Sequence, residues 1–277
     1  MQRFNIMIMS PVRKDDLVHL QCFLEVAQLL RYGLEDLGHQ VGFAKNLQKD
    51  CTNILLAYHI LEDRRLPEGY DCIIYQLEEL YESCETPLER MLNTLRSNCK
   101  IWDFNQQNVA FLRQNGIHAT YKPLGFHPKM ARIQHHRQKD VDILFYGSKN
   151  ERRMKILNAL DQEFNVKILF GVYGQERDEW IARSKIVLSI YYYETKYFDD
   201  VRMSYLLTNR VFTIVEDTPH KRYQDFLIYA PYDSIVETCR YYLQNDELRQ
   251  RLAQETHQAF SQYPETEFLR QALNAMT

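Results

Sequence analysis

A pattern of apolar strand, turn and helix occurs twice in this chain, and this repetition constrains the fold more than any other feature. The second occurrence is the clearer one: an apolar run at 141–146 is followed by Gly147 and Ser148, and then by a helical pattern at 150–162. The first occurrence begins with the apolar run at 4–9. Strands that alternate with helices favour parallel sheets covered by helices. Two such halves predict a cleft between them, with a ligand at the carboxyl ends of the strands.

The first half, residues 1–124, is predicted to form one strand-helix-strand domain. Apolar residues recur at helical spacing from Leu17 to Leu37, with Asp15 or Asp16 as the N-cap and Gly38 as the stop. Short apolar runs predict the other strands, and one polar helix ends at an Asn-Gly pair. The expected strands are 4–9, 39–43, 53–58, 72–75, 100–104 and 118–121, and the second helix is 105–114.

Residues 125–140 are predicted to be a linker, because they are basic and contain few apolar anchors. The second domain is then expected over 141–262, and a last amphipathic helix within 263–277 is a candidate to pack back on the first domain. The expected strands are 143–146, 166–170, 186–191 and 211–215, and the expected helices are 150–162, 175–184, 199–208, 232–243, 247–260 and 265–275.

Charge and apolar content exclude several classes of protein. The net charge is -3, so binding to nucleic acid is not expected from global electrostatics. The run at 4–9 is too short for a signal peptide, and no segment is long enough to be a transmembrane segment, which predicts a cytoplasmic protein. The six cysteines form no Cys-x-x-Cys pair and are predicted to be reduced, structural thiols.

Four short segments carry a resemblance to a known family. They are Leu37-Gly-His-Gln-Val41, Tyr146-Gly-Ser148, Ser184-Lys-Ile-Val-Leu188 and residues 202–216. With them the chain resembles GT-B-fold glycosyltransferases of the group-1 kind, and more narrowly a compact bacterial branch of that family. In that branch a tyrosine-rich strand end, an arginine near the start of the next helix and a strand closing on glutamate recur. The resemblance is best over 141–260 and moderate in the first half, through 74–79 and 102–105.

The resemblance implies an α/β protein of GT-B type, with two Rossmann-like βαβ domains that face each other across a cleft. A nucleotide-diphosphate sugar would bind to residues 141–262 as the donor, and residues 1–124 would hold the acceptor, a glycan, a protein or a small molecule. No metal and no other cofactor is implied, since the sugar nucleotide is itself a substrate.

The chain departs from the family at one motif. Many relatives carry two glutamates eight positions apart, the second of which grips the donor ribose, and in this chain Tyr197 and Tyr205 stand at those places. Recognition of the donor is therefore expected to differ in detail from that of these relatives. A protein that kept the fold but lost the chemistry, and now binds a nucleotide or a glycan without catalysis, is the alternative.

The donor-binding candidates follow the strands of the second half. A helix is expected to begin after Gly147 and Ser148, with Arg152 on its first turn, and the N–H groups and dipole at its start suit a diphosphate. The alternative is a tight turn at Gly147 and Ser148, and a solvated Arg152. Arg202 lies near a helix start, where a cation is unfavourable unless an anion faces it or Asp199 or Asp200 pairs with it. The remaining candidates stand at strand ends or helix starts and are Tyr173, Tyr193, Glu194 and Glu216, with Tyr191 and Tyr192 beside them.

The acceptor-side candidates follow strands of the first half. Direct displacement needs a base for the acceptor hydroxyl, and His59 or Glu78 is the predicted catalytic residue, with Ser10 and Gln76 as binding residues. Ordinary loop residues are the alternative for all four. The acid pair at Asp140 and Asp142 precedes a strand, at the wrong edge of the sheet for a metal site. The histidines at 127, 135 and 136 are expected in a solvated linker without metal.

Overall fold

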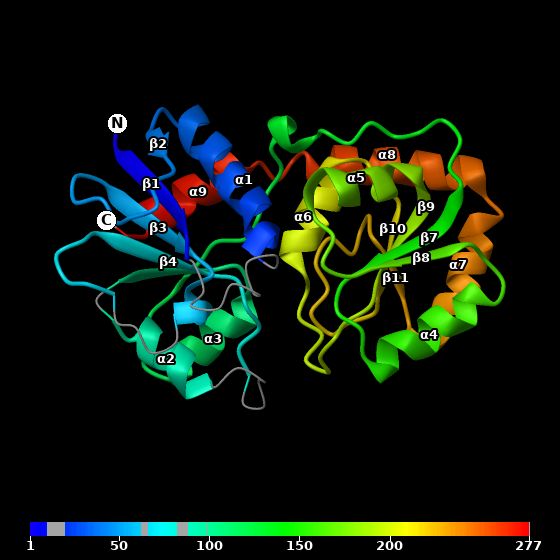
Figure 1. Cartoon of the computed structure of the whole chain (residues 1–277), viewed down its shortest axis with the longest axis horizontal. Coiled ribbons are helices and arrows are strands. Elements are labelled where there is room, and N and C mark those ends of the chain that lie inside the picture. Colours follow the sequence, from blue (N-terminus) through cyan, green and yellow to red (C-terminus); the bar gives the residue numbers. More distant parts are fainter. Residues whose placement is uncertain (10–19, 62–65, 82–87, 98, 277) are drawn as a thin grey trace. The chain divides into compact units, whose positions relative to one another are not determined.

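The protein consists of two compact α/β units (Figure 1). The computed structural model describes residues 1–9, 20–61, 66–81, 88–97 and 99–276. One unit is formed by Met1–His127 together with Pro264–Thr277, and the other by Pro128–Tyr263. In these described ranges each unit contains one sheet whose strand pairs are all parallel, which confirms the predicted fold class. Within the described residues no helix is long and apolar enough to cross a bilayer.

The first unit has a six-stranded sheet of order β2-β1-β3-β4-β5-β6. Its strands are β1 (Arg3–Ile8), β2 (Gln40–Gly42), β3 (Thr52–Leu56), β4 (Cys72–Gln76), β5 (Lys100–Asp103) and β6 (Thr120–Tyr121). Helix α1 (Cys22–Asp36) follows β1, and it ends before Gly38, whose φ of 82° favours glycine. Helix α3 (Gln106–Gln114) is capped by the side chain of Asn105. The predicted caps Asp15 and Asp16 lie outside the described residues.

Helix α2 (Leu88–Leu95) was not predicted, because its eight residues give too short a pattern to separate a helix from a loop. It buries Met91, Leu92 and Leu95 in the same core as Ile74 and Ile101 of the sheet.

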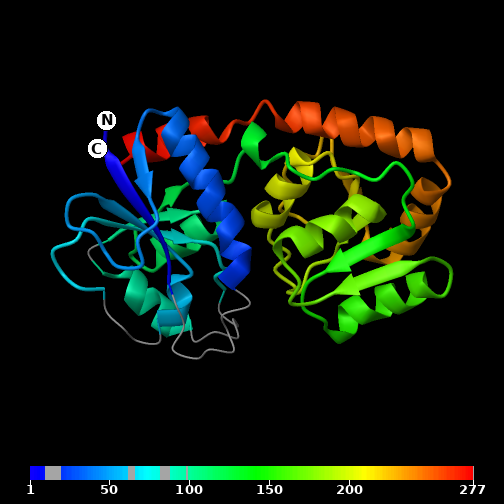
Figure 2. The same ribbon diagram turned by 45° about the horizontal axis from the view of Figure 1, so that its top comes forward.

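Helix α9 (Glu265–Asn274) belongs to the first unit and lies along α1 (Figures 1 and 2). Gly33 permits the close contact: a Cβ added there would lie 2.6 Å from Leu269 Cδ1. At the first residue of α9, the side chain of Glu265 forms an ion pair with Lys122, and both side chains are 0% exposed. Glu265 also accepts from the Gly125 N–H at 2.7 Å. The end of the described chain is therefore fixed to the first sheet by both packing and charge.

The second unit has a five-stranded sheet of order β11-β10-β9-β7-β8. Its strands are β7 (Val141–Tyr146), β8 (Val166–Leu169), β9 (Ser184–Ser189), β10 (Thr213–Glu216) and β11 (Ile228–Ala230). Its helices are α4 (Glu151–Asp161), α5 (Gly174–Arg183), α6 (Asp200–Thr208), α7 (Ile235–Leu243) and α8 (Asp246–Phe260). Helices α4 and α7 share a core with Phe145 and Leu188, whereas α5 and α6 lie on the opposite face (Figure 1). The three-residue β11 was not predicted from the sequence.

Residues 128–140 belong to the second unit. The backbone N–H groups of Arg132 and Ile133 donate to Asn209 Oδ1 at 2.8 and 2.9 Å. His135 Nε2 lies 2.7 Å from the Asn209 carbonyl oxygen, and burial lowers the pKa of this histidine. His127 is only 2% exposed. The predicted solvated environment is therefore wrong for His135, which Asn209 anchors, and for His127, whose ring stacks on Tyr32 and whose Nε2 lies 3.1 Å from Asp36 Oδ2. Such polar and aromatic contacts leave no apolar pattern in the sequence. His136 is exposed, as predicted.

Candidate functional site

Three strand ends and two helix starts of the second unit meet at the carboxyl edge of its sheet. Strands β7, β9 and β10 are neighbours in the sheet, so the segments that follow them come together. These segments contain Gly147 after β7, Tyr191 after β9 and Glu216 at the end of β10, while α4 and α6 begin beside them. This edge is where a parallel sheet usually binds its ligand.

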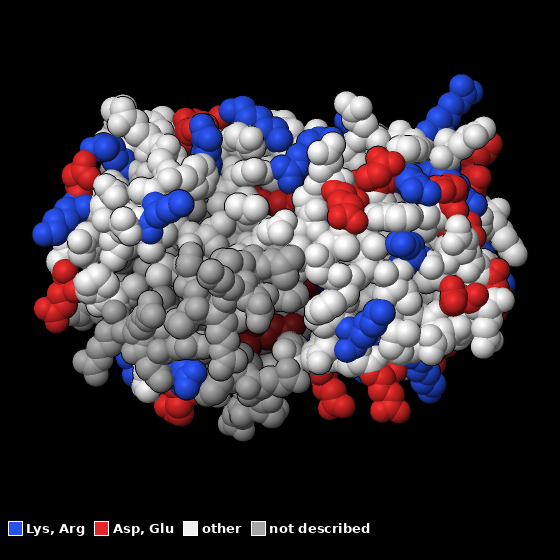
Figure 3. Space-filling view, in the orientation of Figure 1, with Lys and Arg blue, Asp and Glu red and all other residues white. Residues whose placement is uncertain are grey.

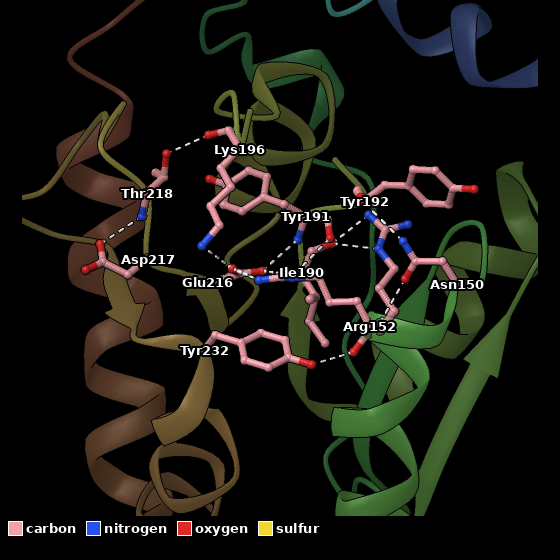
Figure 4. A network of polar contacts seen from close by, with 11 residues as sticks. Asn150, Arg152, Ile190, Tyr191, Tyr192, Lys196, Glu216, Asp217, Thr218 and Tyr232 are labelled. Atoms are coloured by element: carbon pink, nitrogen blue, oxygen red, sulfur yellow. Dashed lines mark hydrogen bonds and ion pairs between the residues drawn. The ribbon is translucent and has the colours of Figure 1, made fainter. Parts of the chain in front are cut away.

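A buried carboxylate stands at the centre of this edge (Figure 4). The Glu216 side chain is 0% exposed and binds both terminal nitrogens of Arg152, with Nη1 2.7 Å from Oε2. Lys196 Nζ lies 2.9 Å from Oε1, and the Tyr191 N–H donates to Oε2 at 3.1 Å. Burial opposes ionisation of Glu216, but the hydrogen bonds from Arg152 and Lys196 outweigh it and lower its pKa. Glu216 and Arg152 are thus held by each other, and the ligand contact predicted for them from the sequence stays a prediction.

Further hydrogen bonds fasten this pair to the sheet. Arg152 Nη1 donates to the Tyr191 carbonyl at 3.2 Å, and the Tyr232 hydroxyl donates to the Arg152 carbonyl at 2.7 Å. The Tyr232 ring also lies 4.1 Å from the guanidinium carbon of Arg152. Asn150 caps α4 through the Arg153 N–H and donates to the Tyr192 carbonyl at 3.1 Å. The network holds the first turn of α4 against the ends of β9 and β10.

Two other guanidinium groups approach Gly147. This glycine has a φ of 141°, and a Cβ added to it would lie 3.3 Å from Arg202 Nη2 and 3.5 Å from Arg153 Nη1. Arg153 donates to the Ser148 carbonyl at 2.8 Å and to the Ile190 carbonyl at 2.6 and 2.9 Å. Burial and the neighbouring Arg202 lower the pKa of Arg153 to about 10. The two cations are therefore held close together against their mutual repulsion.

Arg202 retains unused donors. Its side chain is 13% exposed, its guanidinium carbon lies 4.7 Å from the Tyr146 ring centre, and Nε lies 3.2 Å from Asp199 Oδ2. Among the described residues, its buried Nε and Nη1 have no hydrogen-bond acceptor of good geometry. A buried donor without an acceptor costs about 1–3 kcal/mol. An oxyanion at Gly147 would supply acceptors for Arg202 and relieve the repulsion from Arg153.

A polar hollow adjoins the network through Lys196 and Tyr232. Its volume is about 620 Å³, within the usual size range of small-molecule sites. Thr218 and Lys196 are joined by a hydrogen bond, and Lys221 Nζ lies 2.7 Å from Asp217 Oδ1 (Figure 4 shows Lys196, Asp217 and Thr218). The lining residues are Lys196, Asp217, Thr218, Pro219, Lys221, Gln224, Pro231 and Tyr232. Cations, hydroxyls and one aromatic ring make the hollow suitable for a hydroxylated, charged ligand.

Of the other predicted donor residues, Glu194 lies near enough to interact electrostatically with Arg152. Tyr193 packs edge-on against Tyr192, with ring centres 4.8 Å apart, and Glu194 is exposed. Tyr173 precedes α5, after β8 at the edge of the sheet. The sequence interpretation missed Arg153 and Lys196. Arg153 stands next to Arg152 on the first turn of α4, and Lys196 adopts a φ of 50°, which the sequence does not reveal.

In the first unit, the structure brings His59 and Glu78 together. His59 Nδ1 lies 3.5 Å from Glu78 Oε1. Gln76, which was predicted to face the acceptor, is fully buried instead and donates to Asp103 Oδ2 at 3.0 Å and to the Glu78 carbonyl at 2.6 Å. Burial raises the pKa of Asp103 well above its ordinary value. Gln76 therefore positions the Glu78 loop, and Ser10 lies outside the described residues.

The acid pair of the second unit is engaged by cations. Asp140 pairs with Arg183, and Asp142 Oδ1 lies 2.8 Å from Lys185 Nζ at the amino end of β7. Within the part of the chain that the structure describes, no three His, Cys, Asp or Glu side chains converge as metal ligands. On the face shown in Figure 3, acidic and basic side chains of the second unit are interspersed and form no continuous basic surface.

Comparisons with known proteins identify the fold. No protein-family model matches the chain. An uncharacterised protein of Acanthamoeba polyphaga mimivirus is 24% identical over 239 residues, which cover 82% of this chain and 75% of the viral protein. AviGT4, a glycosyltransferase involved in avilamycin A biosynthesis, superposes with a TM-score of 0.59 at 12% identity, over 99% of this chain and 96% of AviGT4. TarM gives 0.57 at 9% identity, over 93% of this chain, which spans only 57% of TarM.

An alpha1,3-fucosyltransferase gives a TM-score of 0.50 at 8% identity, over 91% of this chain and 80% of that protein. The chain therefore has the GT-B fold of these glycosyltransferases. At such identities the likeness concerns the fold and not the substrate. The sequence relative is viral, so the comparisons give no support to the bacterial branch that the sequence resembles.

Proposed function

We propose that the protein transfers a sugar from a nucleotide-diphosphate donor to an acceptor without a required metal ion. The observation that carries this proposal is the pair of guanidinium groups at Gly147, those of Arg153 and Arg202. Among the described residues, Nε and Nη1 of Arg202 are buried there without a hydrogen-bond acceptor of good geometry. A diphosphate fits such a site in charge and in hydrogen-bonding geometry. TarM, which shares the fold, has been crystallised as a variant with UDP, fondaparinux and alpha-GlcNAc-glycerol.

In this mechanism the arginines stabilise the departing diphosphate. Negative charge builds up on the leaving group as the bond to the sugar breaks, and donors already in place lower the energy of that state. Arg202 and Arg153 take this role together with the N–H groups of the first turn of α4. Arg152 acts as a positioning residue, because its charge is matched by Glu216.

On the acceptor side, the proposal assigns the base to the first unit. His59 accepts the proton of the acceptor hydroxyl if the reaction is a direct displacement, and the carboxylate of Glu78 stabilises the imidazolium that results. The acceptor is a glycan, a protein or a small molecule. A cytoplasmic location remains part of the proposal, and the five described cysteines are free thiols.

Arg202→Ala is expected to weaken nucleoside-diphosphate binding by about 1.5–3 kcal/mol, the value of a hydrogen bond to a charged group. Arg202→Lys should recover only part of the loss, because an ammonium lacks the planar two-pronged geometry. Calorimetric titration with UDP, GDP and their sugars measures the effect. Arg183→Ala is the control, since Arg183 pairs with Asp140 at the amino end of β7 and should leave binding unchanged. Equal affinity of wild type and Arg202→Ala for every nucleotide bound would remove Arg202 from the site.

Nucleotide binding is expected to survive EDTA. The reason is that Asp140 and Asp142, the acid pair of the second unit, are already paired with Arg183 and Lys185. The check is a titration of the chain with its tightest nucleotide before and after EDTA, followed by addition of manganese. Asp142→Asn should bind equally well under all three conditions. Binding that disappears with EDTA and returns with manganese would contradict the proposal.

Binding without catalysis is the second candidate function. It is favoured by Tyr197 and Tyr205 at the places of the paired glutamates, and by the saturation of Glu216. Sugar release from each bound donor, measured with and without candidate acceptors, separates the two functions. Turnover that requires His59 supports transfer, whereas tight binding without any turnover supports the binding protein.

A further inference from the structure

Two cysteines lie next to each other at the amino edge of the first sheet. Strand β4 begins at Cys72, and Cys99 immediately precedes β5. Ile73 lies opposite Lys100 in the register of these parallel strands, so Cys72 and Cys99 stand opposite each other one position earlier. Their side chains share one face, because Cys72 belongs to the apolar cluster against which Cys99 packs. Neighbouring strands lie about 4.8 Å apart, within the range of roughly 4.4–6.8 Å between Cα atoms of a disulfide.

The two thiols differ in access and acidity. Cys72 is 3% exposed, whereas Cys99 is only partly buried and can meet a reagent from solution. A hydrogen bond from the Cys72 thiol lowers the pKa of Cys99 to about 7 and raises that of Cys72. Asp71 and Cys51 also face this pair, and Asp71 opposes the ionisation of Cys99. Cys99 is thus suited to react first, since a thiolate is the reactive form.

We propose that Cys72 and Cys99 form a redox site that closes reversibly to a disulfide. The oxidant is a small-molecule disulfide such as oxidised glutathione. The Cys99 thiolate attacks one sulfur of the oxidant, which forms a mixed disulfide and releases one small thiol. The Cys72 thiol then loses its proton, attacks Cys99 Sγ and expels the second small thiol. Two protein thiols are oxidised and one small disulfide is reduced to two thiols, so atoms and electrons balance.

The first test is oxidation of the whole folded chain. The chain is incubated with oxidised glutathione, quenched in acid, alkylated and digested with trypsin. Cleavage after Arg65 and Arg90 places Cys72 in peptide 66–90, and cleavage after Arg96 and Lys100 places Cys99 in peptide 97–100. Because Cys84 also lies in peptide 66–90, the experiment uses a Cys84→Ser chain. We expect a linked pair of these peptides, lost on treatment with dithiothreitol and unaffected by Cys51→Ser.

Variants of each partner test the order of the steps. Cys72→Ser should leave Cys99 as a stable glutathione adduct, and Cys99→Ser should leave Cys72 unmodified because it is buried. A Cys84→Ser chain with both Cys72 and Cys99 intact would overturn the proposal if Cys99 accumulated as the glutathione adduct without the link, or if both thiols stayed free. So would a link that appears only after denaturation.

A second measurement tests the contact between the thiols without oxidation. The alkylation rate of Cys99 by iodoacetamide should rise with pH around a midpoint near 7. Cys72→Ala should shift this midpoint upward toward the ordinary cysteine value of about 8.5, and slow the reaction at pH 7 about tenfold. Cys51→Ala is the control and should keep a midpoint near that of wild type. An unchanged midpoint in Cys72→Ala would show that the two side chains do not interact, which contradicts the proposal.

Discussion

Lys122→Met is expected to lower the free energy of unfolding of the first unit by about 3–5 kcal/mol, because it leaves a buried carboxylate without its cation. Lys122 and Glu265 are both 0% exposed, so water cannot replace the missing partner. Glu265→Leu should lower the free energy of unfolding by a similar amount, because it leaves the Lys122 ammonium without its carboxylate. The double variant Lys122→Met/Glu265→Leu contains no unpaired buried charge at this site. Its loss of unfolding free energy should therefore be smaller than that of either single variant.

The two tryptophans allow the first unit to be followed alone. Trp102 is buried in the first unit and Trp180 lies in α5 of the second, so a Trp180→Phe background reports unfolding of the first unit through Trp102 fluorescence. Urea titrations of the four chains in that background give the free energies. A double variant whose loss equals the sum of the two single losses would show that the charges do not interact.

Arg152→Ala is expected to destabilise the second unit by about 3 kcal/mol. The change leaves the buried Glu216 carboxylate with Lys196 and one backbone N–H, so the cost lies at the lower end of the range for breaking a buried pair. Hydrogen exchange of the peptides covering α4 and β10 measures the loss locally. Arg251→Ala is the matched control, because its ion pair with Glu255 is exposed and should contribute about 0–1 kcal/mol.

The same pair predicts a pH dependence. The pKa of Glu216 is lowered in the folded protein, so its contribution to stability is complete above the ordinary glutamate pKa of about 4.3 and is lost as the pH falls through the lower folded value. Glu216→Gln should remove this part of the acid sensitivity of the second unit. Equal pH dependence of wild type and Glu216→Gln below pH 4 would contradict the assignment.

Much of the fold was predictable, because the buried faces follow simple periods. The helical spacing of Leu30 and Leu34 in α1, and the apolar run that became β7, identify their elements without tertiary information. The sequence also predicted that Gly147, Arg202 and Glu216 lie at the same edge of the sheet, because the carboxyl ends of parallel strands share one edge. Two parallel sheets, and polar residues gathered at the carboxyl edge of the second sheet, thus follow from local patterns.

The pairing inside the site was not predictable. Arg152 and Glu216 are in contact because β10, β9 and β7 are neighbours in the sheet. No local sequence pattern specifies the order of strands in a sheet. Successive residues of a helix point about 100° apart, so the sequence could not decide that Arg153, and not Arg152, approaches Gly147. Gln76 was misassigned for a related reason: both faces of its parallel strand are covered, and a strand-end amide there is buried as readily as exposed.

The helix α9, which returns to the first unit, sets an order for folding during synthesis. The second unit is one continuous stretch, Pro128–Tyr263, whereas the first needs Pro264 and the residues after it. A ribosome builds the chain from its amino end, so the second unit has all its residues before the first unit has. Until α9 emerges, the α1 surface at Gly33 is uncovered and Lys122 lacks its carboxylate. The half of the protein that is translated first is therefore the half that can complete its fold last.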